Sequence, residues 1–171
     1  MGTDGWLETV YREHAAVLFR FLIRLTGDEA ETRDLLQEIF IRLAKAPQLL
    51  DQVTSPRSYL FRLAHRLAID RHRREETRRR NEERAGSEQP ACAPPDSVLL
   101  DAPWQAEQLF AALSLLPEEQ RAVILLKVWE EMTFAEIAEV LQIPANTAAS
   151  RYRYALDKLK DALRPLKRDL S

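Results

Sequence analysis

The sequence is poor in the residues from which most catalytic and metal sites are built. Its single cysteine, Cys92, cannot form an intrachain disulfide, and it lies among prolines with no histidine nearby, which indicates an incidental thiol. The three histidines have no cysteine or carboxylate cluster at ligand spacing, and no glycine-rich phosphate loop is present. These absences predict a protein with no catalytic activity, no metal and no cofactor of its own.

Long apolar runs are missing as well. No stretch approaches the roughly twenty apolar residues that a membrane span needs, and the amino-terminal sequence has neither the basic region nor the apolar core of a signal peptide. We therefore expect a cytoplasmic protein without membrane insertion.

Glycine is scarce, with four in 171 residues, whereas leucine, alanine, glutamate and arginine fill long stretches. This composition favours helix, and no segment shows the sustained alternation of a β-strand. Residues 86–103 contain four prolines and little apolar periodicity, which is typical of an extended linker. We predict an all-α protein with two small helical domains, residues 1–84 and 104–171, joined by a flexible linker at 85–103.

The first domain is predicted to contain an amphipathic helix whose polar face is acidic. Asp28 can cap this helix, and leucine, isoleucine and phenylalanine recur along its buried side. The opposite face carries Glu31, Asp34, Gln37 and Glu38. Solvation alone would explain such a face in an isolated helix.

A longer helix with an arginine-rich end is predicted to follow. Ser55 is a suitable capping residue before Pro56, and apolar residues mark the buried side as far as Leu67, after which arginines dominate up to Arg84. Such an extension suits contact with nucleic-acid phosphates, because each guanidinium can displace condensed counterions. Interleaved glutamates could instead pair with these arginines, which would leave an ordinary solvated helix end.

Residues 133–156 predict two short helices separated by a tight turn. Thr133 and Glu136 have the spacing of a capping box, and Pro144 prevents one continuous helix because it lacks a backbone N–H. Small residues at Ala138 and Ala148 allow the two helices to cross closely. The pattern is typical of a helix-turn-helix that presents its second helix to the major groove, although an ordinary pair of packed helices would share it.

Charge is unevenly distributed along the chain. The net charge of −2 argues against a protein that coats nucleic acid unaided. Positive charge is concentrated on residues 71–84 and on the last predicted helix, from Arg151 onward. Any contact with nucleic acid should therefore involve these two segments.

Three motifs together resemble bacterial RNA polymerase sigma factors of the compact, extracytoplasmic-function class. They are DLLQEIFIRLAK at 34–45, SPRSYLFRLAHRLAIDRHRR at 55–74, and the segment 116–156, which begins LPEEQRAVILLKVW and includes the helix-turn-helix. Their order, and a linker too short for an additional domain, carry the resemblance over nearly the whole chain.

The resemblance implies a protein that binds core RNA polymerase and directs promoter-specific initiation. The first domain would contact the β′ clamp helices and the melted −10 element, and the second would read −35 duplex DNA and contact the β flap. An anti-sigma factor is a further candidate partner. The low net charge is then expected, since core polymerase would supply most nonspecific affinity for promoter DNA.

The resemblance also assigns site residues. Core-polymerase contacts are implied for Asp34, Gln37 and Glu38. Contacts with the −10 element are implied for Arg62, Arg66, Asp70, Arg71, Arg73 and Arg74. Contacts with the −35 element are implied for Asn146, Thr147, Ser150, Arg151, Arg153 and Tyr154.

Several positions depart from the pattern of the family. Arg66 stands where Asn is often found, and the turn has Gln142 and Pro144 in place of the usual Gly and capping Ser. Residues 148–149 are Ala-Ala in place of a common Val-Lys pair, and an Arg common at position 154 is offset to Arg153. These changes leave the expected fold intact, but base preference is not carried over.

Two other classes of protein fit parts of the sequence. A stand-alone helix-turn-helix regulator would bind duplex DNA by itself as a symmetric homodimer. A helical adaptor that binds only proteins would show no dependence on DNA or promoters.

Overall fold

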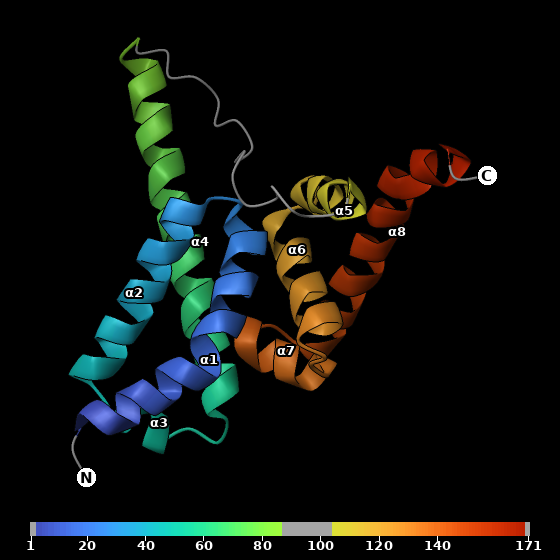
Figure 1. Ribbon diagram of the computed structural model, residues 1–171. Helices are drawn as coiled ribbons and strands as arrows, with labels where there is room; N and C mark the ends of the chain where they lie inside the picture. Colours follow the sequence, from blue (N-terminus) through green and yellow to red (C-terminus); the bar gives the residue numbers. More distant parts are fainter. Residues whose placement is uncertain (1–2, 87–103, 170–171) are drawn as a thin grey trace.

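The computed structural model describes residues 3–86 and 104–169, and within these ranges every regular element is a helix (Figure 1). The first domain comprises α1 (Thr3–Thr26), α2 (Glu29–Lys45), α3 (Gln48–Asp51) and α4 (Pro56–Arg84). The second comprises α5 (Trp104–Ser114), α6 (Glu118–Ile124), the π-helical segment η1 (Leu125–Trp129), α7 (Phe134–Leu141) and α8 (Ala145–Asp169). The predicted all-α class is confirmed, whereas Cys92 and most of the predicted linker lie outside the described residues. None of the described helices combines the length and apolar character needed to cross a membrane.

Capping residues set the helix boundaries of the first domain as predicted. The Asp28 carboxylate accepts a hydrogen bond from the Glu31 backbone N–H at 2.7 Å, which caps α2. The Ser55 hydroxyl accepts from the Ser58 N–H at 3.2 Å, which caps α4 one residue before Pro56. Gly27, at φ +75°, ends α1 in a left-handed conformation that costs glycine no strain.

The core of the first domain lies between α1, α2 and α4. Phe21 of α1 and Phe61 of α4 meet edge to face, with their ring centroids 5.2 Å apart. Leu35 and Ile39 of α2 are completely buried beside them in the same core. Burial of each large side chain contributes about 1.5–3 kcal/mol, so the rotation of α2 and α4 about their axes is firmly set. The acidic face of α2 and most arginines of α4 are thereby held on the surface.

The helix-turn-helix forms from α7 and α8. The predicted capping box is present: Glu136 N–H donates to the Thr133 hydroxyl at 3.2 Å, and Thr133 N–H donates to the Glu136 carboxylate at 2.7 Å. Gln142 adopts φ +54° and ends α7 before Pro144. Ala148 is fully buried, which lets α8 cross close to α7 as its small size predicted.

The two domains pack against each other in this structure. The main contact joins α4 to α7, and α1 also touches α6 and η1 (Figure 1). The carboxyl-terminal part of α4 extends well beyond the packed helices (Figure 1). A long arginine-bearing helix is thus anchored at one end and exposed at the other.

Candidate functional site

The acidic face of α2 lies beside the middle of α4. The side chains of Asp34 and Glu38 are 68% and 37% exposed, and Gln37 is exposed between them. Arg42 donates to one Glu38 oxygen at 2.6 and 3.2 Å. Arg71 of α4 reaches the same face, 3.6 Å from Asp34 and 3.9 Å from Glu38. The structure therefore brings the residues predicted to bind polymerase next to a residue predicted to bind DNA.

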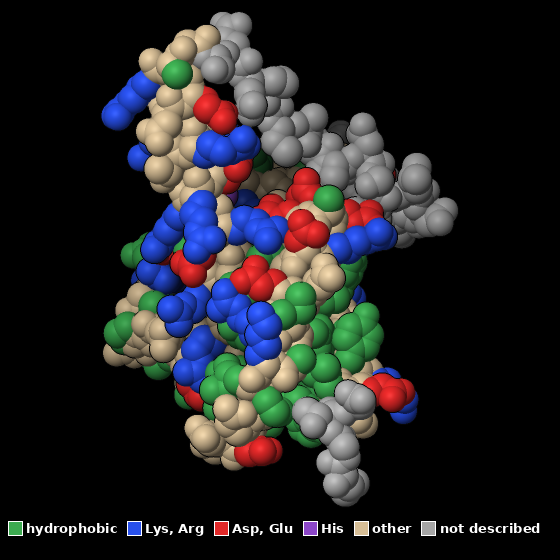
Figure 2. Space-filling model, turned by 90° about the vertical axis from the view of Figure 1, so that its left-hand side faces the viewer, with side chains coloured by type: hydrophobic (Ala, Val, Ile, Leu, Met, Phe, Trp, Pro, Cys, Tyr) green, Lys and Arg blue, Asp and Glu red, His purple; other side chains and the backbone are tan. Residues whose placement is uncertain are grey.

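An apolar groove lies alongside this acidic face, between α1 and α2. It has a volume of about 510 Å³, and its walls include Leu7, Tyr11, Gln37 and Ile41. Tyr11 and Ile41 are 53% and 45% exposed, which is unusual for side chains of their size. In the space-filling view, hydrophobic side chains gather on the lower right, next to a broad band of basic side chains (Figure 2). The sequence did not indicate this groove, because Tyr11 follows Leu7 at the four-residue spacing of a packed helix face.

The arginines predicted to contact the −10 element have different surroundings. Arg66, Arg73 and Arg74 are exposed, and no carboxylate of the described residues lies within ion-pairing distance of them. Arg62 instead lies 3.5 Å from Glu139 of α7, and Asp70 is partly buried on the same helix. Three of the six predicted residues are thus free to meet a nucleic acid.

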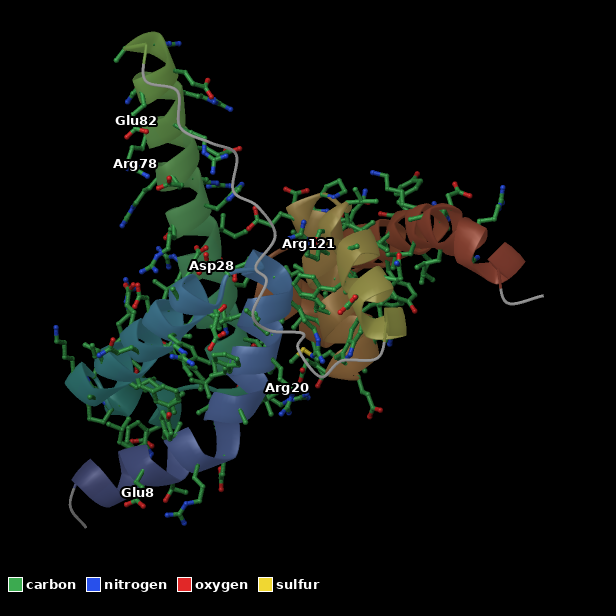
Figure 3. All side chains as sticks on the ribbon, turned by 45° about the horizontal axis from the view of Figure 1, so that its top comes forward. Glu8, Arg20, Asp28, Arg78, Glu82 and Arg121 are labelled. Carbon is green, nitrogen blue, oxygen red and sulfur yellow. The ribbon has the colours of Figure 1, made fainter. Side chains whose placement is uncertain are left out.

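At the carboxyl-terminal end of α4, one arginine pairs with neighbouring glutamates, as the alternative interpretation of the sequence allowed. Arg78 bonds to Glu75 at 2.6 Å and to Glu82 at 3.3 Å, and Figure 3 shows Arg78 and Glu82 along this end of the helix. These contacts lie at the protein surface, so they contribute little to stability. They occupy a guanidinium outside the predicted −10 set and leave Arg73 and Arg74 untouched.

The predicted −35 residues lie on the first turns of α8. Asn146, Arg153 and Tyr154 are exposed, with the Arg153 guanidinium 5.3 Å from the centre of the Tyr154 ring. Thr147 and Ser150 are partly buried, and the Ser150 hydroxyl donates to the Thr147 carbonyl at 3.0 Å. Asn146, Arg153 and Tyr154 form an accessible edge of α8, whereas Thr147 and Ser150 also support the helix.

Arg151, the sixth residue of the −35 set, faces inward. Its guanidinium binds the Glu119 carboxylate of α6 at 2.8 Å, and its side chain is 26% exposed. His65 of α4 is close enough for the charge of Arg151 to affect it. Burial, assisted by that charge, lowers the pKa of His65 to about 4. The amino-terminal part of α8 therefore lies near enough to α4 for this charge to act on His65.

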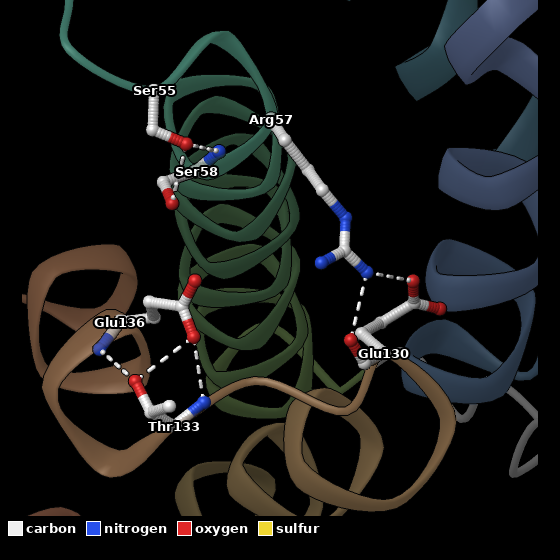
Figure 4. A network of polar contacts seen from close by, with 6 residues as sticks. All are labelled: Ser55, Arg57, Ser58, Glu130, Thr133 and Glu136. Carbon is white, nitrogen blue, oxygen red and sulfur yellow. Dashed lines mark hydrogen bonds and ion pairs between the residues drawn. The ribbon is translucent and has the colours of Figure 1, made fainter.

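A polar network joins α4 to the segment between η1 and α7 (Figure 4). Arg57 donates to the Glu130 backbone carbonyl at 2.8 Å and to its carboxylate at 3.0 Å. Glu130 is one of three buried polar or charged residues in the described part of the chain, at 8% exposure. Its burial is tolerable because Arg57 supplies both a charge and hydrogen bonds.

Arg121 forms a second link between the domains. Its guanidinium donates to the Leu25 carbonyl at the end of α1 at 2.7 Å, and to carbonyls of Leu113, Ser114 and Leu116 at 2.9–3.1 Å. It thus supplies donors to backbone carbonyls at the end of α1 and at the end of α5 and the turn that follows it. Figure 3 shows Arg121 on the side of the second domain that faces α1. Sequence reasoning did not find either link, because both join residues far apart in the chain.

A larger apolar groove lies on the second domain between α5, η1 and α8. It has a volume of about 660 Å³, and Leu109, Val128 and Leu163 are among its apolar walls. Lys160 and Arg164 also line it, so the groove is apolar with basic side chains at its border. This composition suits an amphipathic helix with acidic flanks.

No group of three histidine, cysteine or acidic side chains lies close enough to hold a metal ion in the part of the chain that the structure describes. The exposed residues offer carboxylates on α2, guanidinium groups on α4 and α8, and two apolar grooves, all of which suit binding to other macromolecules.

Comparison with known proteins identifies this combination. The family model for sigma-70 region 2 matches residues 10–78, and that for sigma-70 region 4 matches residues 106–159. ECF RNA polymerase sigma factor SigL of Mycobacterium tuberculosis is 34% identical over 161 residues, which covers 94% of this chain and 90% of SigL. The chain belongs to the ECF RNA polymerase sigma factor family. It is a sigma factor that directs promoter-specific transcription initiation with RNA polymerase, and this family is not catalytic.

Other relatives agree with this assignment. ECF sigma factor SigE of Mycolicibacterium smegmatis is 32% identical over 164 residues, covering 93% of this chain and 62% of SigE. Sigma factor RpoE, solved in complex with the anti-sigma factor NepR from Bartonella quintana, has the same fold, with a TM-score of 0.74, 18% identity, and coverage of 92% of this chain and 96% of RpoE. CnrH, solved with the cytosolic domain of CnrY, has a TM-score of 0.64 and 21% identity to this chain. The match covers 93% of this chain and 88% of CnrH. The stand-alone regulator and the protein-binding adaptor are thereby set aside.

Proposed function

We propose that this sigma factor divides its work between its two domains. Residues 1–84 bind the β′ clamp helices of polymerase and the melted −10 element, and residues 104–171 read the −35 element as duplex DNA. The observation that carries this proposal is the pairing, on one domain, of an exposed acidic face on α2 with exposed arginines on α4. Carboxylates favour a basic protein partner, whereas guanidinium groups favour phosphates.

At the −10 element, Arg66, Arg73 and Arg74 serve as the phosphate contacts. Their exposure, and the absence of a carboxylate within ion-pairing distance among the described residues, support this role. Unpaired bases cost a few kcal/mol to expose, and stacking and pocket contacts on the protein offset that cost. The arginines position the displaced strand along α4 while the bases are held.

At the −35 element, α8 enters the major groove. Asn146, Arg153 and Tyr154 form its accessible edge, and an Arg can read a guanine while an Asn can read an adenine. Thr147 and Ser150 add contacts with DNA beside this edge. Arg151 adds a contact once its guanidinium leaves Glu119. This arrangement follows the usual geometry of a recognition helix.

The two apolar grooves extend the contact with polymerase. We assign the groove between α1 and α2 to the β′ clamp helices, because it adjoins Gln37 and the acidic face. The groove between α5, η1 and α8 is assigned to a helix of the β flap. Both fit the general mode in which an amphipathic helix lays its apolar face into a groove.

Simultaneous binding of both promoter elements requires the domains to separate. Arg62, assigned to −10 DNA, lies 3.5 Å from Glu139 of α7. Arg151, assigned to −35 DNA, pairs with Glu119 of α6 at 2.8 Å, and its charge reaches His65 of α4. These interactions involve surfaces that the two DNA elements would need. The closed arrangement is therefore the form that precedes promoter binding.

Control by an anti-sigma factor in the cytoplasm completes the proposal. The relative RpoE was solved with its anti-sigma factor NepR, and it has the same fold as this chain. The exposed grooves on both domains offer apolar surface to such a partner. An anti-sigma factor that covers them would compete with polymerase.

The test is a charge reversal on α2. The full-length variant Asp34→Arg/Glu38→Arg should lose binding to core polymerase and to the isolated β′ clamp coiled coil, with its helical circular dichroism unchanged. Asp157→Arg/Asp161→Arg on α8 is the matched control, because it makes the same charge change at the same spacing on exposed residues. Normal clamp binding by the α2 variant would overturn the assignment.

A further inference from the structure

Both oxygens of the Glu38 carboxylate already face basic groups of the chain. One oxygen accepts from Arg42 on the same helix, and the other lies 3.9 Å from Arg71 of α4. The second guanidinium nitrogen of Arg71 lies 3.6 Å from Asp34. Arg71 also acts on Glu31, where its charge opposes the rise in pKa that burial causes. One guanidinium of α4 is thus set among three carboxylates of α2.

The contacts of these carboxylates differ in strength. Arg42 makes hydrogen bonds to Glu38 at 2.6 and 3.2 Å within one helix turn. Arg71 approaches Asp34 and Glu38 only at ion-pair distance, beyond the length of a hydrogen bond. A cation brought by a partner to this face would therefore replace Arg71 more easily than Arg42.

We propose that Arg71 couples polymerase binding to −10 DNA binding by exchanging partners. This inference rests on the proposed function, in which Asp34 and Glu38 meet basic residues of polymerase. In the free protein these carboxylates hold Arg71. When polymerase occupies them, the Arg71 guanidinium is released and pairs with a phosphate of the −10 strand.

The exchange makes each partner strengthen the binding of the other. Polymerase has to displace Arg71, so an internal cation competes with its binding. A phosphate that takes Arg71 away removes this competition, and by thermodynamic linkage polymerase raises affinity for DNA by the same factor. Exposed ion pairs are worth about 0.2–1 kcal/mol, which corresponds to an effect of about one and a half- to fivefold.

The decisive measurement is the affinity of core polymerase for full-length Arg71→Gln in the absence of DNA. We expect binding about one and a half- to fivefold tighter than wild type, although Arg71 belongs to the proposed DNA surface. Arg80→Gln, which removes the same charge near the carboxyl-terminal end of the same helix, should leave core binding unchanged. In the Asp34→Asn/Glu38→Gln background, Arg71→Gln should have no further effect.

Weaker or unchanged core binding by Arg71→Gln would overturn the coupling. An equal gain from Arg80→Gln, or a gain that persists in the Asp34→Asn/Glu38→Gln background, would overturn it as well. The two ideas fail separately. If Asp34→Asn/Glu38→Gln alone leaves core binding at the wild-type level, the proposed function is wrong. If that variant weakens binding but Arg71→Gln shows no dependence on it, only the coupling is wrong.

Discussion

The guanidinium of Arg57 donates two hydrogen bonds to Glu130, one to the backbone carbonyl at 2.8 Å and one to the carboxylate at 3.0 Å. The side chain of Glu130 is only 7% exposed, whereas that of Arg57 is 44% exposed. The buried carboxylate therefore depends on a partner from the other domain for its charge to be balanced. This dependence makes the pair a sensitive point of the closed arrangement.

We predict that Arg57→Ala shifts the protein toward separated domains. Hydrogen bonds to charged groups contribute about 1.5–3 kcal/mol, so the ratio of open to closed molecules should rise about ten- to a hundredfold. Small-angle scattering should show a larger radius of gyration, and fluorescence transfer between labels on the two domains should fall.

Arg12→Ala is the control for this measurement. Arg12 also pairs with a glutamate, Glu8, but both side chains are highly exposed and both lie on α1. Its removal should leave the scattering profile unchanged. A profile for Arg57→Ala that matches this control would show that the pair does not hold the domains together.

A second prediction concerns the capping box at the start of α7. Thr133→Ala removes the hydroxyl that accepts from Glu136 N–H, and the loss of such a cap costs about 0.5–2 kcal/mol. Thr133→Ser keeps the hydroxyl and should retain most of the stability. Urea denaturation of the three proteins provides the comparison, and equal midpoints for Ala and Thr would exclude a role for the cap.

Local features of this fold could be predicted from sequence because neighbouring residues determine them. Asp28, Ser55 and Thr133 each cap the helix that they were expected to cap, since an N-cap needs only a side-chain oxygen within three residues of a free N–H. The short helix α3 and the π-helical geometry of η1 were not predicted. Few residues are involved, and they give too little periodicity to reveal a short helix or a change of helix type.

Relations between domains could not be predicted in this way. Nothing near Arg57 in sequence points to Glu130, and Arg121 had no feature that marked it as a cap for α1. The same limit applies to the candidate site. Arg151 belongs to a positively charged segment that the sequence indicated, and Arg62 was assigned to the −10 element by the resemblance, but their pairing with Glu119 and Glu139 depends on tertiary packing.

A third prediction concerns stability in acid. Burial lowers the pKa of His65 to about 4, below the usual value of about 6.5, because the folded protein favours the neutral ring. The unfolded chain therefore binds a proton more readily between these values. The free energy of unfolding should fall as pH drops from about 6.5 to about 4, by up to about 3 kcal/mol from this residue.

His65→Gln should remove that part of the pH dependence. Glu31 and Glu118 have pKa values raised by burial, so their effect has the opposite sign and is lost as pH rises. The difference between wild type and His65→Gln isolates the histidine from these carboxyls. Parallel urea titrations at pH 7 and pH 4.5 measure it, and identical pH dependence in both proteins would contradict a buried neutral ring.

The last prediction separates Arg151 from Arg153 on the recognition helix. Arg153 is exposed, so Arg153→Ala should weaken binding to −35 duplex directly. If its guanidinium reads a guanine edge, the loss should be about 1–3 kcal/mol and selectivity should relax at one base pair. If it contacts a phosphate, all −35 sequences should weaken alike and the salt dependence should decrease by about one charge.

Arg151 has first to leave Glu119, which binds it at 2.8 Å. Glu119→Gln should therefore strengthen −35 binding, and it should do so only while Arg151 is present. The measurement is the affinity of holoenzyme for a set of promoters that carry single substitutions in the −35 element. The proteins compared are wild type, Arg151→Ala, Arg153→Ala, Glu119→Gln and the Glu119→Gln/Arg151→Ala double variant. Arg153 follows Asn146 by seven residues, which places both on one face of α8, so a helix that meets DNA along this face cannot lose Arg153 without an effect. Unchanged promoter use by both Arg151→Ala and Arg153→Ala would mean that another face of α8, or another helix, meets the −35 element.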